Sequence, residues 1–196
     1  MPELKLAVIG EPCMDYIYRG TKAATRQMGG ILYSIVSLAV ISSGNAEIYP
    51  VMNLGEDEFE YVTGFLREFP NIRHDLINKT PHKTRVVNLF YKDIDSVLNL
   101  PAKKTYDREE SSTEPTLPIE YEQIKSCLGG FDGILINMVS GIDLTLDALH
   151  EIRENFSGYI HMDLHNLVMQ TFPDGSRKQM PVYDWKKWVK CCNTLQ

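Results

Sequence analysis

The chain contains 196 residues, 43% of them hydrophobic and 23% charged, an ordinary composition for a globular protein of one domain or for part of a larger one. Its net charge of −6 argues against nucleic acid or an anionic membrane as the main partner. The longest apolar run, Ile31–Ile41, is too short to span a bilayer, and the amino terminus lacks the basic start and long apolar core of a signal peptide, so we expect a cytoplasmic chain.

The first predicted element is a buried strand at Leu4–Ile9, an apolar run that ends in Gly10. A short second strand is predicted at 16–19, before Gly20. The polar residues 21–28 are expected to form a loop.

Gly29 and Gly30 then open an apolar run that contains no further glycine or proline until Gly44. Apolar side chains recur at helical spacing over most of the circumference, which predicts an interior helix that begins at Ile31 and is flanked on several sides. The missing Cβ atoms of the glycine pair and the unpaired N–H groups of the first helical turn suit a hydroxylated or anionic small molecule. A tight entry turn is the alternative explanation of the pair.

The middle of the chain predicts a strand at 47–52, weakened by Pro50, and a helix over 59–66. Residues 84–92 are rich in β-formers, and the loop that follows them allows a return strand at 97–100, so this segment resembles a hairpin. The polar, proline-containing residues 101–118 are expected to form a long exposed connection.

The last third of the chain alternates helices and strands. The predicted elements are a helix over 119–127, a buried strand over 133–139, a helix over 144–156, a strand over 159–164 and a helix over 183–192. This order predicts an α/β fold of three layers, in which helices flank a mainly parallel sheet. The hairpin interrupts the alternation and is best placed in a small separate sheet.

The four cysteines show no C-x-x-C spacing, and the adjacent residues Cys191 and Cys192 could bridge each other only with strain. We therefore expect free, mostly buried thiols. A redox role for the adjacent pair is the alternative.

Ligands of open parallel sheets bind beyond the carboxyl ends of the strands. The polar or small residues that follow the predicted strands are Gly10, Glu11 and Asp15, then Asn137, Ser140 and Gly141, and finally Asp163, His165 and Asn166. Asp15 is the strongest candidate, because a carboxylate near the Gly29–Gly30 backbone can accept hydrogen bonds from vicinal hydroxyls. A solvated turn aspartate is the alternative.

His161, Asp163 and His165 alternate along a predicted strand, so a straight strand would place all three on one face, where they could ligate a metal. We favour the alternative, a strand end that runs into solvent, and predict no metal site. The sequence has neither G-x-G-x-x-G after its first strand nor G-x-x-x-x-G-K-[ST], so a dinucleotide fold or a P-loop has no support.

Several of these pieces, taken in order, resemble the amino-terminal two-thirds of a ribokinase-like sugar kinase of the PfkB family. The matching pieces are Ala7–Gly10 followed by Asp15, the Gly29–Gly30 helix start, Leu54–Phe59 (similar to the family's G-x-D-x-F-G turn), the β-rich segment 84–100, residues 133–141, and Met162–Asn166 (similar to D-x-N). The resemblance covers nearly the whole chain.

The resemblance implies an enzyme that transfers the γ-phosphate of ATP, with Mg²⁺, to a hydroxymethyl group of a sugar or nucleoside. It implies that the substrate is bound by Asp15, Gly29, Gly30, Ser34 and Asn137. The strands near 16–20 and 84–100 would form a β lid that closes over the substrate, excludes water and makes a homodimer.

The sequence also departs from the family's pattern. Ser34 stands where the family usually has Asn, and Glu60 follows Phe59 where a glycine is usual. The G-A-G-D-type motif, which in the family supplies the catalytic aspartate and anion hole, is absent, as is the family's N-x-x-E element near the ATP phosphates, which would begin at about residues 193–196. The resemblance therefore implies that residues 1–196 carry the substrate side only, without catalytic or cofactor-binding residues, and we predict that this chain alone phosphorylates nothing.

Two other functions stay open. The chain could be a non-catalytic sugar-binding or regulatory module that lacks the ATP half. It could also be an unrelated Rossmann-like α/β enzyme that shares only the glycine pair, in which case residues 84–100 would lie in the main sheet.

Overall fold

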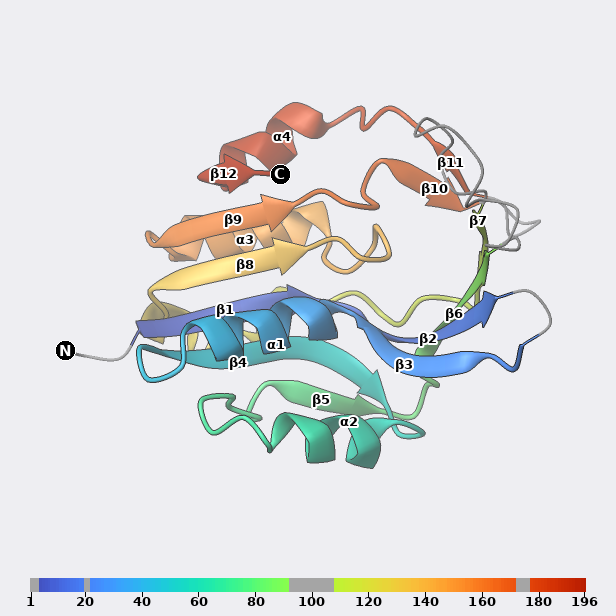
Figure 1. The fold of residues 1–196 in the computed structure, drawn as a ribbon. Helices are drawn as coiled ribbons and strands as arrows, with labels where there is room; N and C mark the ends of the chain where they lie inside the picture. Colours follow the sequence, from blue (N-terminus) through green and yellow to red (C-terminus); the bar gives the residue numbers. More distant parts are fainter. Residues whose placement is uncertain (1–3, 20–21, 92–107, 172–176) are drawn as a thin grey trace, which may run out of the picture.

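The computed structural model describes residues 4–19, 22–91, 108–171 and 177–196. Its main sheet has six strands in the order β12-β9-β8-β1-β4-β5, and every neighbouring pair is parallel (Figure 1). The strands are β1 (Leu4–Gly10), β4 (Ala46–Gly55), β5 (Ile77–Thr80), β8 (Gly133–Asn137), β9 (Tyr159–Asp163) and β12 (Thr194–Leu195).

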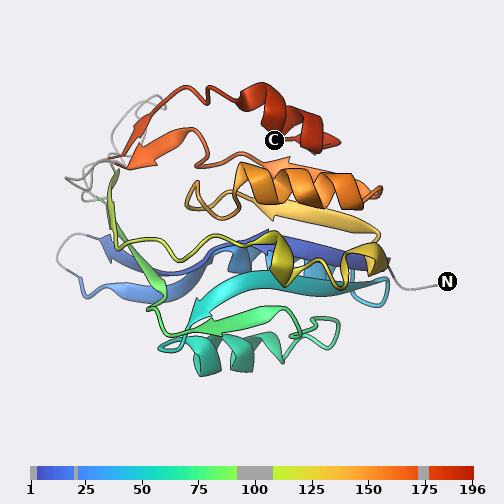
Figure 2. The same ribbon diagram turned by 180° about the vertical axis from the view of Figure 1, so that it is seen from behind.

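Helices cover both faces of this sheet, and each face has its own core. On one face lie α1 (Ile31–Ile41) and α2 (Phe59–Leu66); on the other lie α3 (Leu146–Asn155) and α4 (Trp185–Cys191), as Figures 1 and 2 show from opposite sides. Val8 and Ile9 of β1 are both fully buried, one in each core, because successive side chains of a strand point to opposite faces. The predicted three-layer α/β fold is confirmed.

A second sheet, which we call the side sheet, contains four strands in the order β3-β2-β6-β7. Its strands are β2 (Pro12–Arg19), β3 (Thr25–Gly30), β6 (Arg85–Tyr91) and β7 (Arg108–Ser112). The strands expected near 16–19 and 84–92 are β2 and β6, so these segments lie outside the main sheet. The return strand predicted at 97–100 lies outside the described residues, and β6 pairs antiparallel with β7 instead.

Three predicted segments differ in the structure. Residues 25–30 form β3 and not a loop, because β2 pairs with their backbone along six positions regardless of their polar side chains. Residues 119–127 form only a 3₁₀ turn at Tyr121–Gln123 and no α-helix; Pro118 precedes the segment and Ile119 bridges to Leu144. The connection 101–118 contains β7.

Two small elements have no counterpart in the prediction. The hairpin β10 (Met169–Thr171) and β11 (Arg177–Gln179) follows β9, and β12 adds a short edge strand to the main sheet. Both are too short to leave a hydrophobic period in the sequence. Gly44 follows α1 with a φ of 78°, in the left-handed region that favours glycine, and Pro70 lies shortly after the end of α2.

The first helix is less enclosed than its sequence predicts. Ile31, Ile35 and Ala39 are buried, but Val40 is 60% and Ile41 82% exposed, so α1 packs with one face only. None of the helices in the described part of the chain has the length and apolar character needed to cross a bilayer.

Pro50 is tolerated in the centre of the sheet because of its position. On the side of β4 that faces β5, Ile48 bridges to Ile72 and the ladder with β5 begins at Met52. Pro50 lies between Ile48 and Met52, where β4 has no partner among the described residues on that side. Residues two apart on a strand direct their N–H groups to the same side, and the donor that proline lacks therefore faces no ladder partner.

Candidate functional site

The side sheet leaves the main sheet where β1 ends. The chain passes from Gly10 through Glu11 directly into β2, and the loops after β8 and β9 reach the same edge (Figure 1). Polar residues from distant parts of the sequence therefore meet at the carboxyl edge of the sheet, where open parallel sheets bind ligands.

Asp15 on β2 lies directly against Gly29 on β3. The strands pair antiparallel with Cys13 opposite Gly29, and a Cβ at Gly29 would lie 2.5 Å from Cγ of Asp15. Asp15 is only 9% exposed, and the Cys13 thiol donates to its Oδ1 at 3.3 Å. The carboxylate and the glycine pair, far apart in sequence, thus form one contact that only glycine permits at position 29.

Gly30 sets the start of α1. Its φ of 63° lies in the left-handed region that favours glycine, and a Cβ there would also be 3.2 Å from the Cys13 backbone nitrogen. The N–H of Ile31 donates to the carbonyl of Glu11 at 3.0 Å, so one donor of the first helical turn is already used. The glycine pair therefore makes the tight entry turn, and the side chain that approaches its backbone closely is that of Asp15. The approach of a ligand stays a prediction.

Ser34 and Asn137 form a second contact beside this helix start. Asn137, the last residue of β8, donates from Nδ2 to Ser34 Oγ at 3.4 Å. Its Oδ1 is buried and has no hydrogen-bond partner among the described residues. A buried acceptor without a donor is costly, and a ligand hydroxyl would satisfy it. We call Asp15, Gly29, Gly30, Ser34 and Asn137 the glycine-pair site.

A buried ion pair joins the end of β1 to the first residue of β6. Arg85 Nη1 donates to Glu11 Oε2 at 3.2 Å, and both residues are 3% exposed. Thr116 donates to the other carboxylate oxygen through its hydroxyl at 3.0 Å and through its backbone N–H. Burial raises the pKa of the Glu11 carboxyl above its ordinary value of 4.5, and the Arg85 guanidinium opposes that rise.

A second buried carboxylate organises the loop after β8. Asp143, 4% exposed, accepts backbone N–H groups of Glu11 at 2.8 Å, Val139 at 3.0 Å, Ser140 at 2.9 Å and Gly141 at 3.0 Å. Four backbone donors satisfy the charge that burial would otherwise penalise. The loop is thereby fixed against the end of β1.

The loop after β9 is tied to the loop after β8. Asn166 donates from its backbone N–H to Met138 O at 2.9 Å and from its side chain to Val139 O, while Asp163 Oδ1 accepts the His165 N–H at 3.0 Å. His161 points elsewhere, with Nδ1 2.7 Å from Thr194 Oγ1. No group of three or more His, Cys, Asp or Glu residues suited to a metal occurs in the described part of the chain.

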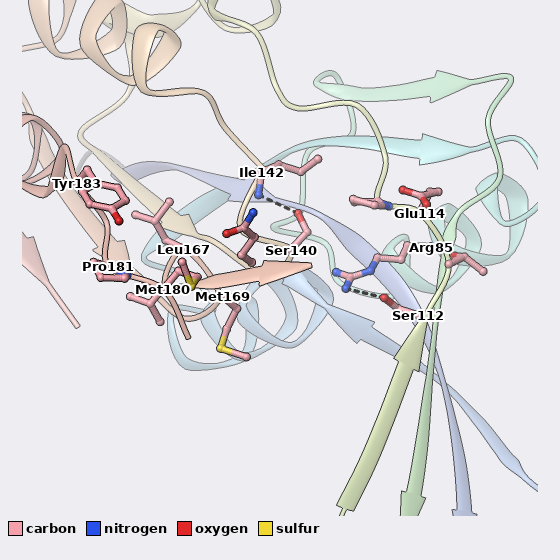
Figure 3. A pocket seen from close by; sticks show the side chains of 14 residues that line it. Arg85, Ser112, Glu114, Ser140, Ile142, Leu167, Met169, Met180, Pro181 and Tyr183 are labelled. Carbon is pink, nitrogen blue, oxygen red and sulfur yellow. Dashed lines mark hydrogen bonds between the residues drawn. The ribbon is translucent and has the colours of Figure 1, made fainter. Parts of the chain in front are cut away.

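A cavity of about 690 Å³ opens between the side sheet, the loop after β8 and the β10–β11 hairpin with the residues beside it. We call this third part, residues 167–171 and 177–183, the β10–β11 arm. Its lining includes none of the residues of the glycine-pair site; it consists of Arg85, Ser112, Thr113, Glu114, Pro115, Ser140, Ile142, Leu167, Val168, Met169, Gln170, Met180, Pro181 and Tyr183. Figure 3 shows Arg85 and Ser112 on one side and Leu167, Met169, Met180 and Tyr183 on the other.

The cavity and the glycine-pair site are neighbours across β2. Cys13 pairs with Gly29 on one side and with Arg85 on the other, so the three residues form one row across the side sheet. Two strand spacings of about 4.8 Å put the backbones of Gly29 and Arg85 about 10 Å apart. Burial and the adjacent Asp15 carboxylate raise the pKa of the Cys13 thiol, which keeps it neutral between the two sites.

The sequence predicted part of this arrangement. Asn137 follows β8 as expected and contacts Ser34 on the first turn of α1, whereas Asp15, expected after a strand, lies within β2 and contacts Gly29 within β3. Their role in substrate binding stays a prediction. Arg85 was missed, although a charged residue that opens a β-rich run was a usable signal. Met169, Met180 and Tyr183 carried no signal, because their convergence depends on how the β10–β11 arm folds.

No protein-family model matches the sequence, and no curated protein matches it either. Solved structures match its fold. A pyrophosphate-dependent kinase in the ribokinase family, solved as a sulfate complex, shares 11% identity at a TM-score of 0.72, over 98% of this chain and 60% of that one. A fructokinase with bound ATP from Xylella fastidiosa shares 16% identity at a TM-score of 0.67, over 97% and 56%.

A nucleoside kinase from Methanocaldococcus jannaschii, an archaeal member of the ribokinase family, shares 12% identity at a TM-score of 0.62, over 97% of this chain and 59% of that chain. The fold of residues 1–196 is therefore ribokinase-like. The chain spans about 60% or less of the length of these three proteins.

Proposed function

We propose that this chain forms the substrate side of a kinase that phosphorylates a hydroxymethyl group of a sugar or nucleoside. The contact between the Asp15 carboxylate and Gly29, beside the start of α1 at the carboxyl edge of a ribokinase-like sheet, carries the proposal. Asp15 would accept hydrogen bonds from vicinal hydroxyls, and the unpaired Asn137 Oδ1 would accept another.

The phosphate donor that we propose is ATP with Mg²⁺. The fructokinase neighbour with bound ATP supports the nucleotide. Residues 1–196 contain no G-A-G-D-type motif, and their N-x-x-E pattern, Asn53–Glu56, lies in the acidic turn at the end of β4, so we propose that the groups that would stabilise the transferred phosphate lie outside these residues. We infer that the whole kinase supplies these groups and that residues 1–196 alone do not transfer phosphate.

The test is a thermal-shift panel of free sugars and nucleosides on the 196-residue chain, together with an ATP-coupled assay. A ligand that binds only the folded state raises the melting temperature. Asp15→Asn should weaken the best ligand about 10- to 100-fold, because a hydrogen bond to a charged group contributes about 1.5–3 kcal/mol. Asp147→Asn, at an exposed position on α3, is the matched control. Robust phosphorylation by the 22.4 kDa chain, or no stabilisation by any polyol, would contradict the proposal.

A non-catalytic sugar-binding or regulatory module is the second candidate. It would use the same contact between Asp15 and Gly29 to bind a sugar and would need no group that stabilises a transferred phosphate. The reading frame downstream of Gln196 separates the two functions, since a G-A-G-D motif there supports the kinase and a stop codon supports the module.

We propose in addition that the side sheet acts as the lid, and that it pairs with a second copy of the chain. Phe90 is 39% exposed and stacks on Tyr18 with ring centroids 4.6 Å apart, which leaves an aromatic surface on this sheet. Sedimentation should show a dimer that Phe90→Asp dissociates.

The four free cysteines fit a reducing compartment, and we propose the cytoplasm.

A further inference from the structure

The 690 Å³ cavity has one polar wall and one apolar wall. The polar wall belongs to the side sheet and its exit, with Arg85, Ser112, Thr113 and Glu114. The apolar wall belongs to the loop after β8 and to the β10–β11 arm, and its members are Ile142, Leu167, Met169, Met180, Pro181 and Tyr183. Figure 3 shows the two groups facing the same space.

The polar wall offers hydrogen-bond donors. Ser112 Oγ accepts from Arg85 Nη2 at 3.1 Å, and Thr113 Oγ1 accepts from the Val86 N–H at 2.9 Å, so both hydroxyl hydrogens remain available. Arg85 is 3% exposed, and its Nε has no hydrogen-bond partner among the described residues. Because Glu11 compensates the Arg85 charge, this wall suits a neutral acceptor such as a carbonyl or ring nitrogen better than an anion.

The apolar wall favours a ring that carries fewer hydroxyls than a free sugar. Hydroxyls that face Met169 or Leu167 would find no hydrogen-bond partner on that wall, whereas those on the side of Tyr183, which is 86% exposed, would stay in water. A flat ring with polar atoms on its edge satisfies both walls, since its face packs on methionine and tyrosine while its edge accepts from the polar wall. The volume lies within the range of about 300–1,000 Å³ that holds such ligands.

We propose that this cavity is a subsite for the planar, heteroatom-bearing ring of a two-part substrate, so that the acceptor is a nucleoside and not a free sugar. The inference rests on the proposed function, because it needs the sugar of the nucleoside at the glycine-pair site. The row of Gly29, Cys13 and Arg85 places the two sites side by side across β2. The β10–β11 arm, which supplies Met169 and Met180, then determines substrate specificity.

The experiment compares D-ribose and D-fructose with adenosine, inosine, cytidine and uridine by thermal shift and calorimetry on the 196-residue chain. At least one nucleoside should bind about tenfold or more tightly than ribose. Met180→Trp, at a position that is 37% exposed and lines the cavity, should fill the subsite, bring nucleoside affinity down to that of ribose and leave ribose binding unchanged. Val40→Trp, on exposed α1, is the matched control and should change neither.

Tyr183→Ala provides a second variant, because Tyr183 is 86% exposed and its loss does not threaten the fold. It should weaken nucleosides about three- to tenfold through the lost ring contact and leave ribose unaffected. Equal affinity of the wild type for ribose and every nucleoside, or unchanged nucleoside binding in Met180→Trp and Tyr183→Ala, overturns the subsite while the proposed function stands. Failure of every sugar and nucleoside to bind overturns both.

Discussion

At the scale of single residues, Gly29 and Gly64 respond oppositely to the same change. A Cβ at Gly29 would lie 2.5 Å from Cγ of Asp15, whereas a Cβ at Gly64 would meet nothing within 4 Å. We predict that Gly29→Ala lowers the free energy of unfolding by about 1–3 kcal/mol and displaces the carboxylate, which removes ligand binding. Gly64→Ala, on the exposed face of α2, should raise the free energy of unfolding by about 0.5–1 kcal/mol. Urea denaturation measures both, and a neutral Gly29→Ala would refute the contact.

Glu11 predicts a specific pH dependence. Burial raises its pKa in the folded chain above 4.5, although Arg85 opposes the rise and Asp143 adds to it. Above pH 4.5 the folded state therefore retains a proton that the unfolded state has released, so this contribution to stability is complete below pH 4.5 and is lost as the pH rises through the raised pKa. The difference in unfolding free energy between wild type and Glu11→Gln should fall from pH 4.5 upwards.

Urea denaturation at several pH values up to about 7.5 measures this difference. Glu151→Gln, which changes an exposed glutamate on α3, is the control and should show no such slope. A difference between wild type and Glu11→Gln that stays constant over the range would mean that the Arg85 guanidinium outweighs burial at Glu11.

At the scale of elements, the acidic turn after β4 holds the beginning of β6. Asp57 Oδ1 accepts the Thr84 N–H at 2.9 Å and the Thr84 hydroxyl at 3.1 Å, and that hydroxyl oxygen accepts the Gly55 N–H at 3.1 Å. Asp57→Ala should cost about 1–3 kcal/mol and should speed hydrogen exchange in β6 but not in β9. Asp147→Ala on α3 should leave exchange in both strands unchanged. Equal acceleration in β6 and β9 would indicate a global effect in place of a local one.

The elements that the sequence predicted are those whose own side chains specify them. The buried runs of β1 and β8 and the amphipathic α3 are examples, and Thr145 caps α3 by accepting the Ala148 N–H. By contrast, β3 owes its strand conformation to pairing with β2, which no local period records. Residues 119–127 were predicted as a helix and form only a 3₁₀ turn, because the bridge between Ile119 and Leu144 holds the start of this segment extended.

The candidate site was predictable to the same extent. The rule that ligands bind beyond strand ends nominated Asn137, which does follow β8, and Asp15, which lies within β2; the glycine pair marked the start of α1. The cavity could not be found in this way, because Arg85, Ser112 and Met180 come from three distant segments. Only the folded side sheet and the β10–β11 arm bring them together.

At the scale of the whole molecule, the four thiols report on global unfolding. All four cysteines are free, and burial raises the pKa of each, to about 11 for Cys192. We predict slow reaction with a thiol reagent at about pH 8 in the native state and fast reaction of all four thiols in urea. A ligand at the glycine-pair site should slow labelling of Cys13 further. Immediate labelling of Cys13 and Cys191 in the native chain would contradict their buried positions; Cys127 and Cys192 are only partly buried.

Glu11 has a mechanical consequence for the side sheet. Its N–H, its carbonyl and its carboxylate bind the loop after β8, the start of α1, and Arg85 with Thr116. Swinging Arg85 away would leave the buried Glu11 carboxylate without its cation and with Thr116 as its remaining donor, at a cost of about 3–5 kcal/mol. We therefore expect the end of the side sheet at Arg85 to stay fixed, while the displacement of β6 grows from Arg85 towards Tyr91. Closure over a ligand would then come from bending of the outer half of the side sheet.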